Sequence, residues 1–325
     1  MKQAMVDAPL GDDVFGDDPT VQRLEAMVAE RLNKEAAVFV TSGTQSNLLA
    51  LMSHCGRGDG YIVGNQAHCY GWEGGGAAVL GSIQPQVVPM LADGLPDPTA
   101  IAAAVKPEDP HFARTKVVCL ENTKDGIVQS IARMEEATDT ARAHGLATHL
   151  DGARMWNAAV ALGVDGATLT APFDTVSLCL SKGLGTPMGS VLSGPAALIG
   201  EARKYRKMLG GGLRQVGMVA AAGIYALDHH VDRLADDHAN AAALAEALSA
   251  IDGIEIRAQN TNMVFCSAGQ VDPAALTEAM EAAGVLALWY STPDGTTETR
   301  LVTHFDVSTG DLGLVANAVE QALAS

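Results

Sequence analysis

The chain has 325 residues, of which 48% are hydrophobic and only 4% aromatic, and its net charge at neutral pH is −17. This length suits one large domain and a smaller one. The acidity argues against a nucleic-acid or anionic-membrane partner, because phosphate groups are bound by extended basic surfaces. No apolar stretch reaches the length of a membrane span and the start of the chain lacks the apolar core of a signal peptide, so we expect neither membrane insertion nor secretion.

Cysteines and histidines show no metal-binding or disulfide pattern. The five cysteines are scattered without a C-x-x-C pair, which is typical of reduced, buried thiols in a cytoplasmic enzyme. The spacing of most histidines predicts structural or surface positions and no metal site. These are His144, His149, His229, His230 and His238.

Short apolar runs alternate with helical patterns over the first 200 residues, as in strands joined by crossover helices. The predicted strands are Ala36–Val40, Tyr61–Val63, Gln86–Val88, Lys116–Leu120, Ala147–Leu150, Thr175–Leu180 and Ser190–Leu192. Helices are predicted between them, among others over Thr44–Ser53 and Met134–His144. This order predicts an α/β fold whose mostly parallel central sheet is covered on both faces.

The pattern changes after about residue 200, where an alanine-rich helical region runs from Gln215 to Ile251. Short strands are then predicted at Ile254–Ile256, Met263–Cys266, Leu286–Trp289 and Thr299–Thr303, with a helix at Pro273–Ala283. Two segments rich in turn formers, Ala92–Pro98 and Ser291–Thr297, are expected to be flexible. We therefore predict a large domain over residues 1–230 and a small C-terminal α+β domain over residues 231–325.

Lys182 follows a predicted apolar strand and precedes a glycine-rich turn, in the segment Ser-Leu-Cys-Leu-Ser-Lys-Gly-Leu-Gly. A lysine at a strand end with small neighbours is suited to carry pyridoxal phosphate as a Schiff base, since the cofactor must approach the backbone. A surface lysine that ends a strand has the same local pattern. The interpretation therefore depends on the residues that accompany Lys182.

Asp151 ends an earlier strand, in His-Leu-Asp-Gly-Ala-Arg. Pyridoxal phosphate withdraws electrons only while its pyridine nitrogen is protonated, and a carboxylate beside that nitrogen keeps it so. Asp151 is the candidate for this role, and Arg154 could reach the ring hydroxyl. A helix-capping aspartate followed by an exposed arginine is the structural alternative.

A third segment, Thr41-Ser42-Gly43-Thr44-Gln45-Ser46-Asn47, follows the first strand and opens a helix. Backbone N–H groups and hydroxyls at such a helix start form a site for a phosphate ester, although the same residues also simply cap helices. In order along the chain, a phosphate site, a pyridinium partner and a Schiff-base lysine follow three strands. We therefore predict a pyridoxal phosphate site whose phosphate lies at this segment.

Three further residues are candidates for contact with the cofactor or substrate. His68 follows a strand, where its ring could stack on the cofactor, and His111 lies in a proline-rich loop, where it could face a substrate. Arg300 lies on a predicted strand of the small domain and is suited to bind the carboxylate of an amino-acid substrate in bidentate fashion. Each of the three has an ordinary structural or surface role as its alternative.

With these residues, the chain resembles the low-specificity L-threonine aldolases of the β-eliminating lyase group, pyridoxal phosphate enzymes of the aspartate-aminotransferase fold (fold type I). The resemblance runs through nearly the whole chain. Its most specific segments are Gly11–Thr20, Gly75–Gly81, Leu150–Arg154, Leu180–Gly185 and Arg206–Gly212.

The resemblance implies a role for each candidate. Lys182 forms the aldimine with the cofactor, Asp151 and Arg154 contact its ring, and Ser42, Gly43 and Thr44 hold its phosphate. His68 stacks on the cofactor, His111 lies near the substrate hydroxyl, and Arg300 binds the substrate carboxylate. Lys207 and Arg214 contribute to the active site of a neighbouring subunit. Active sites shared in this way make a dimer the minimum unit, and because the family is usually tetrameric, the resemblance implies a homotetramer, a dimer of dimers.

The chain departs from the family pattern at three places. Family members normally begin with a strand containing Ser-Asp-Thr-Val-Thr, and this chain starts after it. Lys124 stands where the family usually has histidine after Glu-Asn-Thr, and Gly71-Trp72-Glu73 replaces a more usual polar-aromatic run after His68. The change after His68 is expected to reshape the substrate pocket.

The implied activity is retro-aldol cleavage of L-threonine, L-allo-threonine and related β-hydroxy-α-amino acids to glycine and an aldehyde. The alternatives are another reaction of the same cofactor, namely β-elimination, transamination or racemisation, or a non-catalytic protein that binds the cofactor. The base that takes the β-hydroxyl proton is either His68 or a water positioned by His111.

Overall fold

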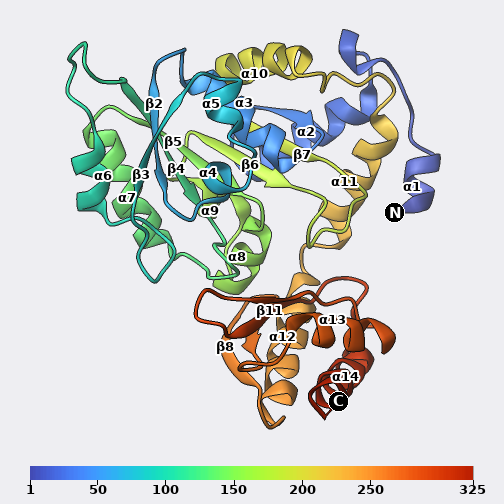
Figure 1. Ribbon diagram of the computed structural model, residues 1–325. Helices are drawn as coiled ribbons and strands as arrows, with labels where there is room; N and C mark the ends of the chain where they lie inside the picture. The colour runs from blue at the N-terminus through green and yellow to red at the C-terminus, as the bar shows by residue number, and fades with distance from the viewer. Residues whose placement is uncertain (325) are drawn as a thin grey trace. The chain divides into compact units, whose positions relative to one another are not determined.

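A computed structural model describes residues 1–324 of the chain, which divides into two compact units, Met1–Val231 and Asp232–Ser325 (Figure 1). No helix within the described residues combines the length and the apolar character that a membrane crossing demands. The first unit is built on a seven-stranded sheet and the second on a four-stranded sheet.

The seven strands of the large sheet lie in the order β1-β7-β6-β5-β4-β2-β3. They are β1 (Ala36–Val40), β2 (Gly60–Gly64), β3 (Gln84–Val88), β4 (Thr115–Glu121), β5 (Ala147–Gly152), β6 (Thr175–Cys179) and β7 (Ser190–Gly194). All pairs are parallel except those of β7, which runs antiparallel to both β1 and β6. The predicted mostly parallel α/β sheet is thereby confirmed, and each predicted strand of this unit overlaps an observed one.

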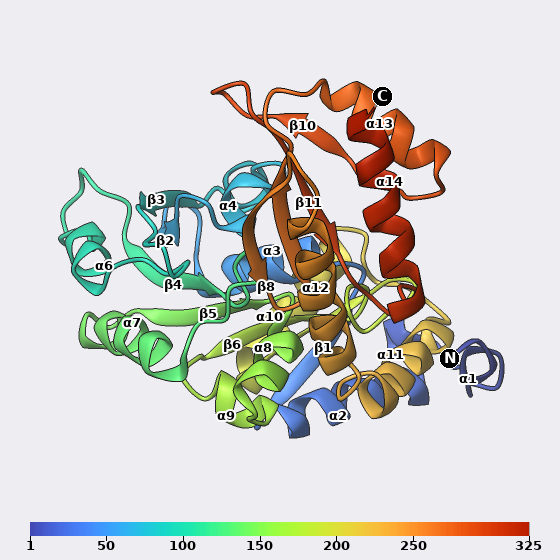
Figure 2. The same cartoon turned by 90° about the horizontal axis from the view of Figure 1, so that it is seen from below.

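Helices cover both faces of this sheet, as Figure 2 shows for the large unit. Side chains of α3 and α10 pack on Val38, Val40 and Leu192. From α2, Glu25 accepts a hydrogen bond from the Phe39 amide of β1. The helices of the unit are α1 (Lys2–Val6), α2 (Pro19–Arg31), α3 (Gly43–His54), α4 (His68–Gly71), α5 (Gly76–Val79), α6 (Pro98–Ala104), α7 (Ile131–Ala143), α8 (Met155–Leu162), α9 (Gly166–Thr170), α10 (Ala196–Met208) and α11 (Gly217–His229).

The direction of the strands decides which segments meet. Because β7 is antiparallel to both of its neighbours, β1 and β6 run the same way, and β6 is parallel to β5, β4 and β2 in turn. The carboxyl ends of β1, β2, β4, β5 and β6 therefore lie at one edge of the sheet. In open α/β sheets this is the edge at which ligands bind.

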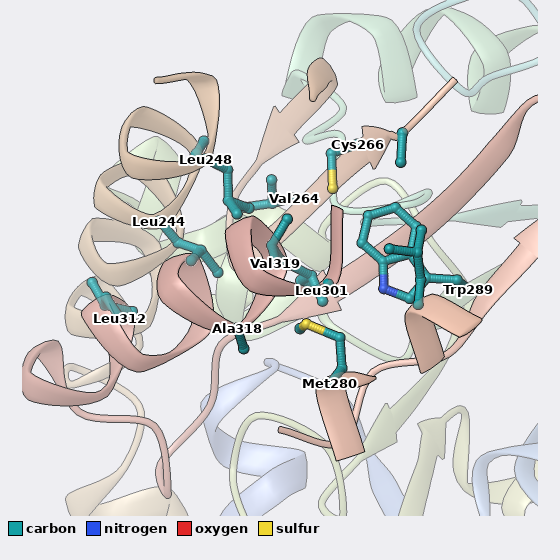
Figure 3. Close-up of a cluster of buried hydrophobic side chains, with 14 of the residues drawn as sticks. Leu244, Leu248, Val264, Cys266, Met280, Trp289, Leu301, Leu312, Ala318 and Val319 are labelled. Carbon is teal, nitrogen blue, oxygen red and sulfur yellow. The ribbon is translucent and has the colours of Figure 1, made fainter. Parts of the chain in front are cut away.

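The small unit packs helices on an antiparallel sheet of order β10-β11-β9-β8. Its elements are α12 (Leu234–Ser249), β8 (Glu255–Asn260), β9 (Met263–Ser267), α13 (Pro273–Ala282), β10 (Trp289–Ser291), β11 (Thr297–Val302) and α14 (Leu312–Ala324). Figure 3 shows its core, in which Leu248 of α12, Val319 of α14 and Trp289 of β10 are buried together.

Two predicted elements are corrected. The helical region Gln215–Ile251 is two helices, α11 and α12, because the chain turns at residues 230–233, where the His230 ring bonds the Leu184 carbonyl at 2.6 Å. The predicted strand Leu286–Trp289 begins only at Trp289, since the preceding residues are not extended into the sheet and Leu286 and Leu288 are exposed. The predicted flexible segment Ser291–Thr297 forms the turn between β10 and β11.

Replacing Leu248 with alanine should destabilise the protein by about 2–5 kcal/mol, because this fully buried side chain (0% exposed) leaves a cavity that the core fills only in part. Urea unfolding measures the change. Leu286→Ala in the same unit is the matched control, since Leu286 is 90% exposed and its loss should change the free energy of unfolding by less than about 0.5 kcal/mol. Equal effects of the two substitutions would contradict this description of the core.

Candidate active site

The carboxyl edge of the large sheet gathers most of the predicted site residues. Ser42 follows β1, His68 follows β2, Asp151 lies near the end of β5 and Lys182 follows β6. In register, Asp151 pairs with Glu121 of β4 on one side and with Ser177 of β6 on the other. Asp151 therefore lies between β4, which ends at Glu121, and β6, which is followed by Lys182.

Ser42 is the N-cap of α3, and its Oγ accepts from the Gln45 amide at 3.1 Å. The amide of Thr41 donates to Gln45 Oε1, which closes the loop between β1 and the helix. A side chain placed on Gly43 would meet only Ser190 Oγ within 4 Å, at 3.7 Å, so the space in front of this helix start is open. Ser190 Oγ is itself buried and has no hydrogen-bond partner in the described chain. Open space, free N–H groups and a spare hydroxyl fit a phosphate ester.

Asp151 is buried, and both of its oxygens accept hydrogen bonds. Oδ2 accepts from Asn47 Nδ2 at 2.8 Å, and Oδ1 accepts from the Ala153 amide at 3.1 Å. The next residue is Gly152. A Cβ at this position would lie 2.7 Å from the Ser177 carbonyl oxygen, so only glycine fits here. Arg154, two residues further on, directly precedes α8. A fixed carboxylate at a strand end fits the partner of a protonated ring nitrogen.

Lys182 lies in the turn directly after β6, where its carbonyl accepts from the Gly185 amide at 2.9 Å. It is half-buried, and its charge acts on the nearby His68, whose pKa it lowers. Together with the phosphate-binding loop and Asp151, this position fits the cofactor that the sequence predicts.

His68 begins α4, and its Nδ1 is hydrogen-bonded to Glu73 Oε1 at 2.9 Å. This hydrogen bond raises the pKa of His68, while burial and the nearby Lys182 ammonium act in the opposite direction. Burial raises the pKa of Glu73 in turn. The His68 amide also donates to Glu121 Oε2 at 3.0 Å, which ties the start of α4 to the end of β4.

The acidity of Glu121 is strongly altered. Burial, followed by the charge of Asp151, raises its pKa to about 7, and Lys124 acts against this shift. Lys124 is itself buried and pairs with Asp125. The lysine that replaces the family's usual histidine therefore stands beside the acidic group of the site.

Three side chains that the sequence argument did not assign belong to this cluster: Asn47, Glu73 and Glu121. Asn47 Nδ2 donates to both Glu73 and Asp151, so one amide bridges two carboxylates. The ligand atoms of His68, Glu73 and Asp151 lie within 4.8 Å of one another, a clustering that histidine spacing alone does not reveal. Glu121 directly follows the predicted strand Lys116–Leu120, which is a signal in the sequence, whereas Asn47 and Glu73 lie away from any strand end.

Lys207 and Arg214 flank the glycine-rich turn after α10. A Cβ on Gly211 would lie 2.3 Å from Gln45 Nε2, so this turn packs directly on the first turn of α3. Arg214 is more than half exposed and pairs with Asp12 at 2.7 Å. Both predicted residues therefore lie in a segment that also contacts the phosphate-binding helix.

His111 does not join the cluster within the subunit. It precedes β4, whose seven residues extend about 20 Å, whereas the cluster lies past the end of that strand. Its side chain is 84% exposed and, among the described residues, is hydrogen-bonded only to Asp109, at 2.6 Å. Reaching a site of this kind would require His111 to come from another subunit.

Arg300 lies in the small unit, on β11 opposite Phe265 of β9. The neighbouring Thr299 and Leu301 are buried, so Arg300 is on the face of the strand that points away from the core, and it is exposed. It forms no ion pair within the described residues.

Comparison with known proteins assigns the family. The sequence model of the beta-eliminating lyase family matches residues 1–270. The chain is 51% identical over 316 residues, 97% of its length, to the low specificity L-threonine aldolase of Escherichia coli K12, of which it covers 93%. It is 40% identical to a probable low-specificity L-threonine aldolase 2 of Arabidopsis thaliana, covering all of this chain and 94% of that one.

Solved structures agree on the fold. A putative L-allo-threonine aldolase of Listeria monocytogenes superposes with a TM-score of 0.82 at 22% identity, over 98% of this chain and 92% of the other. A threonine aldolase of Leishmania major gives the same TM-score and identity over 95% and 91%. The predicted fold class is confirmed, and so is the predicted cofactor, because enzymes of the matched family use pyridoxal phosphate. The chain belongs to the beta-eliminating lyase family.

Proposed function

We propose that this protein is a low-specificity L-threonine aldolase, which cleaves L-threonine, L-allo-threonine and related β-hydroxy-α-amino acids to glycine and an aldehyde. The observation that carries the proposal is the meeting of Lys182, Asp151 and the Ser42 loop at one sheet edge, next to the His68–Glu73 pair. The 51% identity to an E. coli enzyme of that name supports the choice of reaction.

Different residues bind different parts of the cofactor. Lys182 binds its aldehyde carbon, Asp151 faces its ring nitrogen, Arg154 reaches its ring hydroxyl, and the loop from Ser42 to Thr44 holds its phosphate. Lys207 and Arg214 complete the phosphate site of a neighbouring subunit. Bound in this way, pyridoxal phosphate withdraws electrons from the bond to be broken when that bond stands perpendicular to its ring.

His68 accepts the proton of the substrate's β-hydroxyl group. Its Nδ1 is occupied by Glu73, so its Nε2, which no described residue bonds, is the nitrogen available to a substrate. Glu73 both orients the ring and favours its protonated form. A neighbouring subunit's His111 would stand near the same hydroxyl and select the substrate.

Arg300 holds the substrate's carboxylate. The guanidinium group is suited to a bidentate contact, and it has no ion pair to break first within the described residues. Fixing the carboxylate sets the rotation about the substrate's Cα and so decides which bond stands perpendicular to the ring.

The assembly we propose is a homotetramer built as a dimer of dimers, in the cytoplasm. Exposed apolar side chains near the predicted shared residues support such contacts: Phe15 is 73% and Met208 71% exposed. The five cysteines are all free and buried, as suits a reducing compartment.

Lys182→Ala should abolish both the visible absorption of the purified enzyme and its release of aldehyde from L-threonine, because the cofactor loses its covalent anchor. Lys204→Ala, which removes an exposed lysine on α10, is the control and should keep both. Wild-type enzyme that gives a keto acid or ammonia in place of glycine and acetaldehyde would contradict the proposed reaction.

Arg300→Gln should raise KM for L-threonine roughly 10- to 100-fold, because a charge-assisted carboxylate contact is lost. The visible band should be unchanged, since the cofactor is held by the other unit's residues. Steady-state kinetics measure the effect. Arg257→Gln, an exposed arginine on β8 of the same unit, should leave KM within twofold of the wild type.

Glu73→Gln should move the acidic limb of the kcat/KM profile to lower pH. His68 must be neutral to accept a proton, so the wild-type rate falls as the pH drops through the raised pKa of His68. Removing the Glu73 carboxylate removes the main cause of that raised pKa. Rates measured from acid to neutral pH test this, and an unmoved limb would exclude His68 as the base.

A further inference from the structure

A continuous line of hydrogen bonds leads from Asp151 away from the candidate active site. Asn47 Nδ2 donates to Asp151 Oδ2 at 2.8 Å, and Asn47 Oδ1 is 3.1 Å from His149 Nε2. His149 Nδ1 is 2.9 Å from Thr175 Oγ1, which is 2.8 Å from His54 Nε2. Four residues from α3, β5 and β6 thus form one chain that ends on the carboxylate.

The line is buried. Asn47 is 1% exposed, and His149 and Thr175 are 0% exposed. Polar groups at such positions are costly unless every donor and acceptor is paired, and apolar side chains would fill the same space more cheaply. A polar chain that ends on Asp151 therefore calls for an explanation beyond packing.

The donors and acceptors can be arranged in only one direction. Both Glu73 and Asp151 offer acceptors alone, so the Asn47 amide group must point its NH2 toward them and its oxygen toward His149. His149 must then donate from Nε2, which leaves Nδ1 to accept from the Thr175 hydroxyl. The Thr175 oxygen in turn accepts from His54 Nε2.

This arrangement requires neutral rings, and the surroundings supply them. Burial lowers the pKa of His149 to about 3 and that of His54 to about 4. At neutral pH each ring therefore carries one N–H, as the single direction demands.

We propose that Asn47, His149 and Thr175 are positioning residues, which fix the orientation of the Asp151 carboxylate toward the cofactor's ring nitrogen. The inference rests on the proposed function only in that Asp151 faces that nitrogen. The threonine hydroxyl selects the tautomer of His149, the histidine N–H selects the orientation of the Asn47 amide, and the amide holds Asp151.

Thr175→Val tests the line two residues away from Asn47, since valine keeps the shape of threonine and removes only the hydroxyl. The holoenzyme variant is dialysed against decreasing pyridoxal phosphate and its bound cofactor is followed by the visible band. We expect the dissociation constant to rise about fivefold and kcat for L-threonine to fall by a similar factor, with KM within twofold. Thr175→Ser, which restores the hydroxyl, should return both values to those of the wild type.

Two results would overturn the proposal: a Thr175→Val enzyme that binds the cofactor as the wild type does, or equal losses in Thr175→Val and Thr175→Ser. The cofactor readout does not depend on the substrate. A wild type that binds pyridoxal phosphate but releases no aldehyde would therefore refute the aldolase assignment alone.

A second pair of variants covers the case in which Thr175→Val does not fold. The amide nitrogen of glutamine matches the position of histidine Nε2, whereas asparagine matches only Nδ1. His149→Gln keeps the donor to Asn47 and should bind the cofactor more tightly than His149→Asn by about fivefold. Equal cofactor affinity in the two variants would refute the positioning role.

Discussion

The common direction of β5 and β6 is the constraint on which this structure depends. Parallel pairing of Asp151 with Ser177 brings the end of β5 beside the turn that carries Lys182. Reversal of β7 then lets β1 end at the same edge, so the loop at Ser42 arrives there as well. A carboxylate, an amine and an anion-binding loop, far apart in sequence, are placed together by strand direction rather than by any local motif.

This arrangement concentrates acidic groups that repel one another. Glu73, Glu121 and Asp151 lie at one edge, and burial, followed by the charge of Asp151, raises the pKa of Glu73 and of Glu121. The Asn47 amide donates to both Glu73 and Asp151 and so offsets part of their repulsion.

Much of this could be predicted from the sequence because strands and their ends have local signals. The apolar runs around Ala36–Val40 and Ala147–Leu150 predict strands, and the polar residues that follow them predict a site at one edge. Long-range partners have no such signal: nothing near Asn47 in the sequence indicates His149, and nothing near Leu286 indicates that the chain enters the sheet only at Trp289. The roles of His111 and Arg300 depend on how units and subunits meet, which local patterns do not encode.

Helix α3 carries three separate parts of the proposed cofactor site. Its N-terminal turn carries the residues proposed to bind the phosphate, its middle presents Asn47, and its last residue, His54, begins the line of hydrogen bonds. A shift of this helix along its axis would move the proposed phosphate contacts and the support of Asp151 at the ring nitrogen at the same time. Efforts to broaden the range of aldehydes accepted should therefore leave α3 intact and vary residues outside it, where changes to substrate contacts can be made without loosening the cofactor.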